Sequence, residues 1–64
     1  MDADGIFELI VKADERLKYA NDAKGDQRRQ QARALLEQAR DAARELGNDG
    51  LVAQAETRLA DLDG

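Results

Sequence analysis

The stretch "ARALLEQARDAARELGNDGLVAQAETRLADL", Ala32 to Leu62, determines the fold that this sequence predicts. Its first part places Ala and Leu at the spacing of one helix face, at Ala32, Leu35, Leu36, Ala39, Ala43 and Leu46. After "GND" the same spacing resumes, at Leu51, Val52, Ala55, Leu59 and Leu62. Gly47 is expected to end the first helix in a left-handed conformation, and Asn48 or Asp49 to cap the second. The stretch therefore predicts two antiparallel helices joined by a short turn.

A third helix is predicted upstream of this hairpin. Its apolar face consists of Ile6, Leu9, Ile10, Ala13, Leu17 and Ala20. Gly25 is expected to follow its last turn in a left-handed conformation, and Asp26 to cap the next helix. We therefore predict an all-α, three-helix, up–down–up bundle in a single domain, residues 1–64, with helices at about 4–23, 26–46 and 49–62 and antiparallel hairpin packing.

Two segments of the chain resemble each other. "LIVKADERL", residues 9–17, and "LVAQAETRL", residues 51–59, share the pattern Leu-x3-Ala-x3-Leu on the first and third predicted helices. The offset is 42 residues. The echo is either an internal repeat that docks both helices alike on the second, or a consequence of an Ala- and Leu-rich composition. In either case Gln54, Glu56 and Arg58 are expected only to face water.

The composition predicts a thin core and few kinds of chemistry. Of the 27 apolar residues 12 are Ala, and the chain lacks Cys, His and Pro. Such a core suits helices that approach closely across Ala, or a chain that gains burial by association. The net charge of −4 argues against a dedicated nucleic-acid or anionic-membrane surface. There is no long apolar run, and the first residues, "MDADG", are acidic. We therefore expect a cytoplasmic protein with no membrane association.

The segment Ala32–Leu62 resembles the tetratricopeptide-like units of bacterial regulatory proteins. There, a helix of the form A-x2-LL-x2-A-x3-A-x2-LG is followed by a short turn and a helix that opens with L-x3-A-x3-L. The chain departs from that family in its 42-residue offset, which exceeds the usual period of about 34, and in lacking the family's aromatic and Pro positions. The resemblance implies about one and a half units of a helix–turn–helix module for protein interaction, with no catalytic residue.

Two acidic features are candidate sites for chemistry. The turn "GNDG", residues 47–50, lacks the alternating acidic ligands of a calcium loop, so a helix stop and N-cap is the better interpretation. Asp14 and Glu56 are equivalent in the echo, but a carboxylate pair needs a shielded pocket that so small a bundle has little room to form. We therefore predict no catalytic, cofactor-binding or metal-binding residue, and no enzymatic activity.

Four arginines of the second predicted helix fall within an arc of about 60°, namely Arg29, Arg33, Arg40 and Arg44. They are the best candidates for binding an anion or an acidic partner. Acidic residues lie among them and no aromatic residue accompanies them, so nucleic-acid binding is disfavoured. The favoured interpretation is that their aliphatic stems cover apolar flanks and that they pair with the neighbouring acids.

Three large residues of the first predicted helix lie at the edge of its apolar face or outside it: Phe7, Val11 and Tyr19. They indicate either a contact surface or a helix that is buried over a wider arc. The function that we favour is a non-catalytic protein–protein interaction module, which forms a homo-oligomer or docks another helical protein through these residues. The alternatives are a small structural or engineered bundle with no partner, and a nucleic-acid-associated accessory protein that uses the four arginines.

Overall fold

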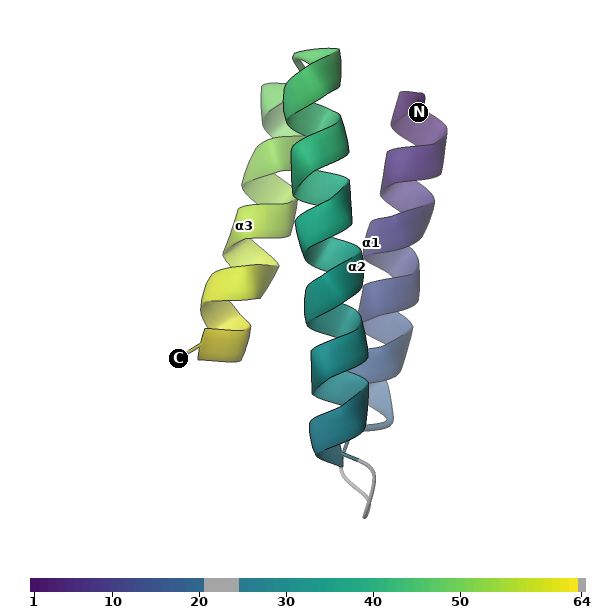
Figure 1. Ribbon diagram of the computed structural model, residues 1–64, viewed down its shortest axis with the longest axis vertical. Coiled ribbons are helices and arrows are strands. Elements are labelled where there is room, and N and C mark those ends of the chain that lie inside the picture. The colour runs from purple at the N-terminus through teal and green to yellow at the C-terminus, as the bar shows by residue number, and fades with distance from the viewer. Residues whose placement is uncertain (21–24, 64) are drawn as a thin grey trace.

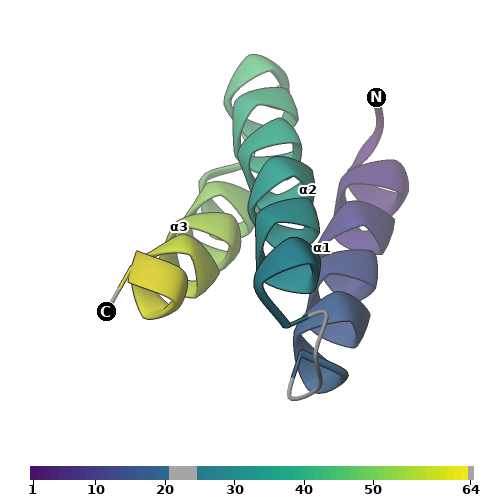
Figure 2. The ribbon, with the colours of Figure 1, turned by 60° about the horizontal axis from the view of Figure 1, so that its bottom comes forward.

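The computed structural model describes residues 1–20 and 25–63, and within them the chain forms three helices and no strand. The helices are α1 (Ala3–Lys18), α2 (Gly25–Leu46) and α3 (Asp49–Asp63). They run up, down and up, with α1 and α3 on the two sides of α2 (Figures 1 and 2). The all-α, three-helix fold predicted from the sequence is confirmed.

The start and the end of α1 are both fixed by local hydrogen bonds. The Asp2 side chain caps the helix by accepting a hydrogen bond of 2.8 Å from the backbone N–H of Gly5. At the other end the N–H of Ala20 bonds to the carbonyl of Leu17 at 3.2 Å, which tightens the last turn. The helix therefore ends at Lys18, and its predicted continuation through Tyr19 and Ala20 is wrong. The rest of that predicted end, residues 21–24, lies outside the described residues.

Gly25 has a different role from the one predicted. It is the first residue of α2 rather than a left-handed residue after α1, and among the described residues only Gly47 is a glycine with positive φ. A Cβ at position 25 would lie 2.2 Å from the carbonyl oxygen of Ala20. Glycine is therefore required here by a close approach of two backbone segments. Asp26 is likewise not the predicted N-cap, since it lies within the first turn of α2.

The turn between α2 and α3 forms as predicted. Gly47 has φ of 76°, and the N–H groups of Gly47 and Asn48 bond to the carbonyls of Arg44 and Ala43 at 3.1 and 2.9 Å. These bonds satisfy the last carbonyls of α2. Asn48 then caps α3, because its Oδ1 accepts a hydrogen bond of 3.1 Å from the N–H of Leu51.

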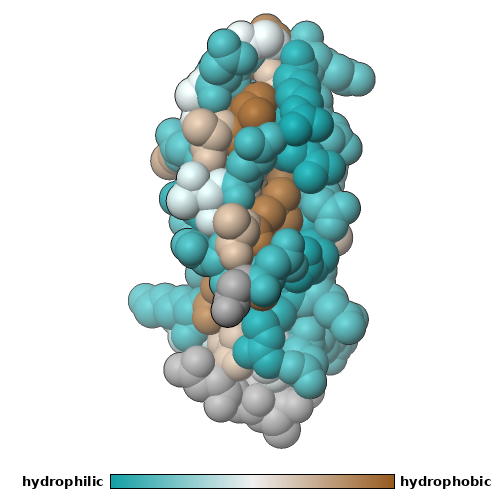
Figure 3. Space-filling model, turned by 90° about the vertical axis from the view of Figure 1, so that its left-hand side faces the viewer, coloured by the Kyte–Doolittle hydropathy of each residue, from teal (hydrophilic) through white to brown (hydrophobic). Residues whose placement is uncertain are grey.

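The core lies where α1 and α3 pack against α2, and it consists mainly of small residues. Ile6, Ile10 and Leu36 are its largest fully buried side chains. The other fully buried core residues are Ala13, Ala32, Ala39, Ala43 and Ala55. The Cα atoms span 37 × 21 × 13 Å, which describes a flat molecule. From the α3 side, hydrophobic residues show at the surface as an interrupted strip bordered by hydrophilic ones (Figure 3).

Most residues of the predicted apolar faces are buried or half-buried, with one exception. Leu46 was predicted to lie in the core, but 48% of its surface is exposed. It is the last residue of α2, so no further turn of that helix covers it.

The two echo segments are buried to different extents. Ala13 and Ala55 are both fully buried, as the pattern predicts. Leu51 and Leu59 of α3 are buried, whereas Leu9 and Leu17 of α1 are only partly buried. The main buried residues of α1 are instead Ile6 and Ile10. The two helices therefore share the central alanine but differ in the large residues around it.

Candidate interaction surfaces

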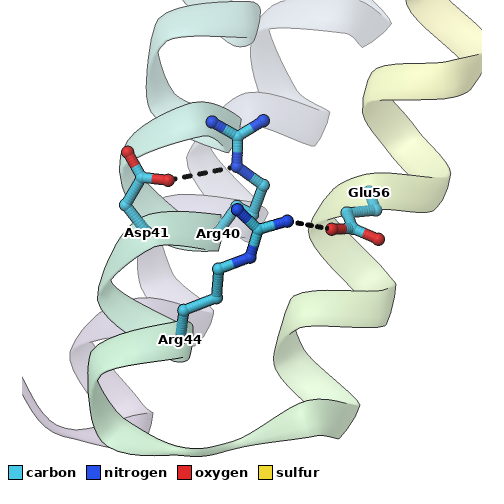
Figure 4. A network of polar contacts seen from close by, with 4 residues as sticks. All are labelled: Arg40, Asp41, Arg44 and Glu56. Atoms are coloured by element: carbon cyan, nitrogen blue, oxygen red, sulfur yellow. Dashed lines mark hydrogen bonds and ion pairs between the residues drawn. The ribbon is translucent and has the colours of Figure 1, made fainter.

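The four arginines that were predicted to form an anion-binding face each pair with a carboxylate. Arg29 pairs with Asp26, Arg33 with Asp63, Arg40 with Asp41 at 3.1 Å and Arg44 with Glu56 at 2.7 Å. Figure 4 shows the last two pairs, with the Arg44 guanidinium reaching from α2 to the Glu56 carboxylate on α3. The predicted pairing with neighbouring acids is confirmed for Arg29 and Arg40, whereas Arg33 and Arg44 pair with acids of α3.

Two of these arginines connect α2 to α3. The hydrogen bond between the side chains of Arg33 and Asp63 raises the pKa of the arginine and lowers the pKa of the aspartate. Arg44 makes the second connection, through Glu56. Because all four guanidinium charges are matched by carboxylates within the molecule, little of their positive charge is left for an external anion.

Asp14 and Glu56, the carboxylates considered as a catalytic pair, bind different arginines. Asp14 accepts hydrogen bonds of 2.9 and 3.1 Å from Nε of Arg58, which joins α1 to α3. Arg58 also donates to the backbone carbonyl of Gln54 at 3.1 Å. The prediction that Glu56 and Arg58 only face water is therefore wrong, because both take part in ion pairs between helices.

Phe7, Val11 and Tyr19 are exposed, which rules out burial of α1 over a wider arc. Their exposed fractions are 49%, 38% and 57%. Phe7 and Val11 lie one helical turn apart, whereas Tyr19 follows the last residue of α1 and lines a different surface. Met1 and Leu46 are the other large hydrophobic residues exposed in the described part of the chain. Met1 was not among the predicted interface residues, and Leu46 was predicted to lie in the core.

The surface that Tyr19 lines is a groove between α1 and α2. Its volume is about 580 Å³, and its lining residues are Lys12, Glu15, Arg16, Tyr19, Arg28 and Leu35. Smaller hollows of about 190 and 240 Å³ are lined almost entirely by polar side chains. This groove was not predicted from the sequence, because Leu35 was expected on the buried face of its helix, whereas in the structure Leu35 is only partly buried.

Comparisons with protein families, with curated proteins and with solved structures find no match to this chain. No helix in the described residues is both long enough and apolar enough to cross a membrane. In residues 1–20 and 25–63, no three His, Cys, Asp or Glu side chains gather closely enough to hold a metal ion. The function must therefore be argued from the surfaces of the bundle.

Proposed function

We propose that this chain is a non-catalytic protein-interaction module whose α1 helix docks a helical protein, and that a second copy of the chain is such a partner. The observation that carries the proposal is the exposed pair of Phe7 and Val11, one turn apart on α1. The chain has only one Phe and two Val. Burying these exposed side chains against a partner would add hydrophobic stabilisation that the small core of the chain does not provide.

The charges beside this pair support a second copy as the partner. Asp4 and Lys18 lie seven residues before and after Val11, on the same side of α1 as Phe7. In an antiparallel pair of α1 helices related by a two-fold axis near Val11, Asp4 of each copy would face Lys18 of the other. Opposite charges would then meet twice around the apolar pair, an arrangement that favours this orientation over the parallel one.

The small surface sets the expected affinity. One face of a 16-residue helix buries less than the ~800 Å² per partner of a standard stable interface. Association is therefore expected in the micromolar to millimolar range. The likeness to tetratricopeptide-like units, which also pair antiparallel helices across small residues, is part of the same proposal. It is supported by the fully buried alanines between α1, α2 and α3.

Analytical ultracentrifugation over a wide concentration range tests the proposal. We expect the mass of the wild-type chain to rise with concentration, and the rise to disappear in Phe7→Ser/Val11→Ser. Leu46→Ser, which alters a similarly exposed residue at the end of α2, should associate like the wild type. Lys18→Glu should weaken association, and Asp4→Lys in that background should restore it.

The same experiment has a clear contrary outcome. A chain that stays monomeric at every concentration, with Phe7→Ser/Val11→Ser as stable as the wild type, would contradict self-association. That result would favour a structural domain with no partner.

A further inference from the structure

Two cations that pair with no carboxylate among the described residues line the groove between α1 and α2. Among the described residues, Arg29, Arg33, Arg40, Arg44 and Arg58 all form ion pairs. Lys12 and Arg16, one turn apart on α1, line the groove and pair with no carboxylate of the described residues. Arg28 also lines the groove, from α2, and Glu15 is the one acidic residue of the lining, so Lys12 and Arg16 outnumber it. The groove is therefore basic on a chain whose net charge is −4.

The lining also contains apolar surface, which an inorganic anion would not use. Tyr19 is 57% exposed, and Leu35 is partly buried at the edge of the core. The Lys18 ammonium lies 5.8 Å from the centroid of the Tyr19 ring, so the aromatic end of the groove is also close to a cation. A ligand that fits this lining carries negative charges beside an apolar side chain.

We propose that this groove binds an acidic, amphipathic segment of a partner protein. Its carboxylates would contact Lys12 and Arg16, and an apolar side chain would lie between Tyr19 and Leu35. A nucleic acid fits less well, because the groove offers a single aromatic ring and the net charge of the chain repels a polyanion. The inference extends the proposed interaction function to a second surface, which excludes Phe7 and Val11.

Tyr19 provides a direct test, because it is the only Tyr in a chain without Trp, so the tyrosine fluorescence of the protein reports on the groove alone. The probe is a short synthetic peptide without aromatic residues, in which glutamates flank leucines at helical spacing. We expect the Tyr19 emission to change saturably with peptide concentration at low salt. The affinity for the peptide should fall as salt is raised. A peptide with Gln in place of Glu, and one with Ser in place of Leu, should both bind more weakly.

Charge-matched variants locate the binding. Lys12→Gln and Arg16→Gln should each lower the affinity for the acidic peptide about two- to fivefold, as expected for exposed ion pairs. Arg40→Gln removes the same charge from a residue whose ion pair lies within α2, with its neighbour Asp41, and should bind like the wild type. Circular dichroism of each variant checks that the helices remain folded.

Three outcomes would overturn the inference. The first is that the Tyr19 emission does not change at low salt. The second is that Arg40→Gln loses as much affinity for the peptide as the groove variants do. The third is that a single-stranded oligonucleotide binds more tightly than the peptide. Repeating the titration with Phe7→Ser/Val11→Ser separates this inference from the self-association of α1. Peptide binding should persist in that variant even if the wild-type chain proves to be a monomer.

Discussion

At the scale of single residues, the fold depends on positions where a side chain must be small. Ala13 on α1 and Ala55 on α3 are fully buried, so each lets its helix come close to its neighbours. Gly25 is needed because a backbone oxygen lies where its Cβ would be. Gly47 adopts a left-handed conformation that other residues rarely take.

Enlarging the buried alanines should destabilise the bundle. Ala13→Leu and Ala55→Leu would each force a larger side chain into filled space, so we expect the free energy of unfolding to fall by about 1–3 kcal/mol. Ala60→Leu is the control on α3, because Ala60 is exposed, and it should change stability by less than about 0.5 kcal/mol. Urea denaturation measures all three. Equal tolerance would mean that the two alanines are not at close contacts.

Replacing Gly25 or Gly50 by alanine should affect the stability of the chain differently. Gly25→Ala places a Cβ 2.2 Å from the Ala20 oxygen and should destabilise the chain. Gly50→Ala lies in the first turn of α3, where its Cβ would meet nothing closer than the Asn48 side chain at 3.5 Å. It should therefore leave stability unchanged or raise it by about 0.5–1 kcal/mol, since alanine favours helix. Thermal melts of the two variants compare them, and a stabilised Gly25→Ala would disprove the close approach.

At the scale of helices, the turn between α2 and α3 is predicted by the sequence better than the end of α1 and the start of α2. The turn at residues 47–49 was predicted because its caps are local, formed by Gly47 and Asn48 with residues close in the chain. The end of α1 and the role of Gly25 depend on the contact between Ala20 and the start of α2. No pattern in either helix alone reports that contact.

The interaction surfaces were predicted to a smaller extent than the helices. Helical spacing placed Phe7 and Val11 at the edge of the apolar face or outside it, but their exposure became known only from the structure. The ion pair of Asp14 with Arg58 joins residues 44 positions apart, so it needs the packing of α1 beside α3 to be known. The α1 side of the groove could have been predicted, because Lys12 and Arg16 lie at i and i+4 outside the apolar face of α1. The α2 side could not be predicted without knowing where Leu35 lies in the structure.

The pairing of α3 with α2 through Asp63 should depend on pH. The hydrogen bond from Arg33 holds the pKa of Asp63 below its ordinary value of 3.8. A carboxylate with a lowered pKa in the folded state stabilises the fold above 3.8 and loses that contribution as the pH falls through its folded-state pKa. Asp63→Asn should therefore be less stable than the wild type near neutral pH and equally stable in strong acid. The expected difference is small because both side chains are exposed.

Asp61 provides the control for this prediction. It lies on the same helix, is exposed, and forms no ion pair in the described part of the chain. Asp61→Asn should follow the wild type in stability at every pH in a series of urea titrations. A difference between Asp63→Asn and the wild type that persists in strong acid would show that the aspartate acts other than through its charge.

At the scale of the whole molecule, the bundle is flat, and its exposed apolar residues, its basic groove and its paired arginines lie on different surfaces. One face of α1 exposes Phe7 and Val11 beside charged residues, the groove beside Tyr19 is basic, and Arg29, Arg33, Arg40 and Arg44 of α2 are matched by acids. With a core made largely of alanine, association would add apolar burial that the chain alone cannot reach. The central claim is therefore that the face of α1 that exposes Phe7 and Val11 is a surface for self-association.

An NMR dilution series of the uniformly labelled wild-type chain tests this claim most directly. Backbone amide shifts are followed from about millimolar to low micromolar concentration, the range in which a small interface dissociates. We expect the concentration-dependent shifts to cluster around Phe7 and Val11 and to reach Asp4 and Lys18, while α3 and the end of α2 near Leu46 stay unchanged. Shifts that are absent over the whole range, or that centre on Leu46 or on α3, would contradict the claim.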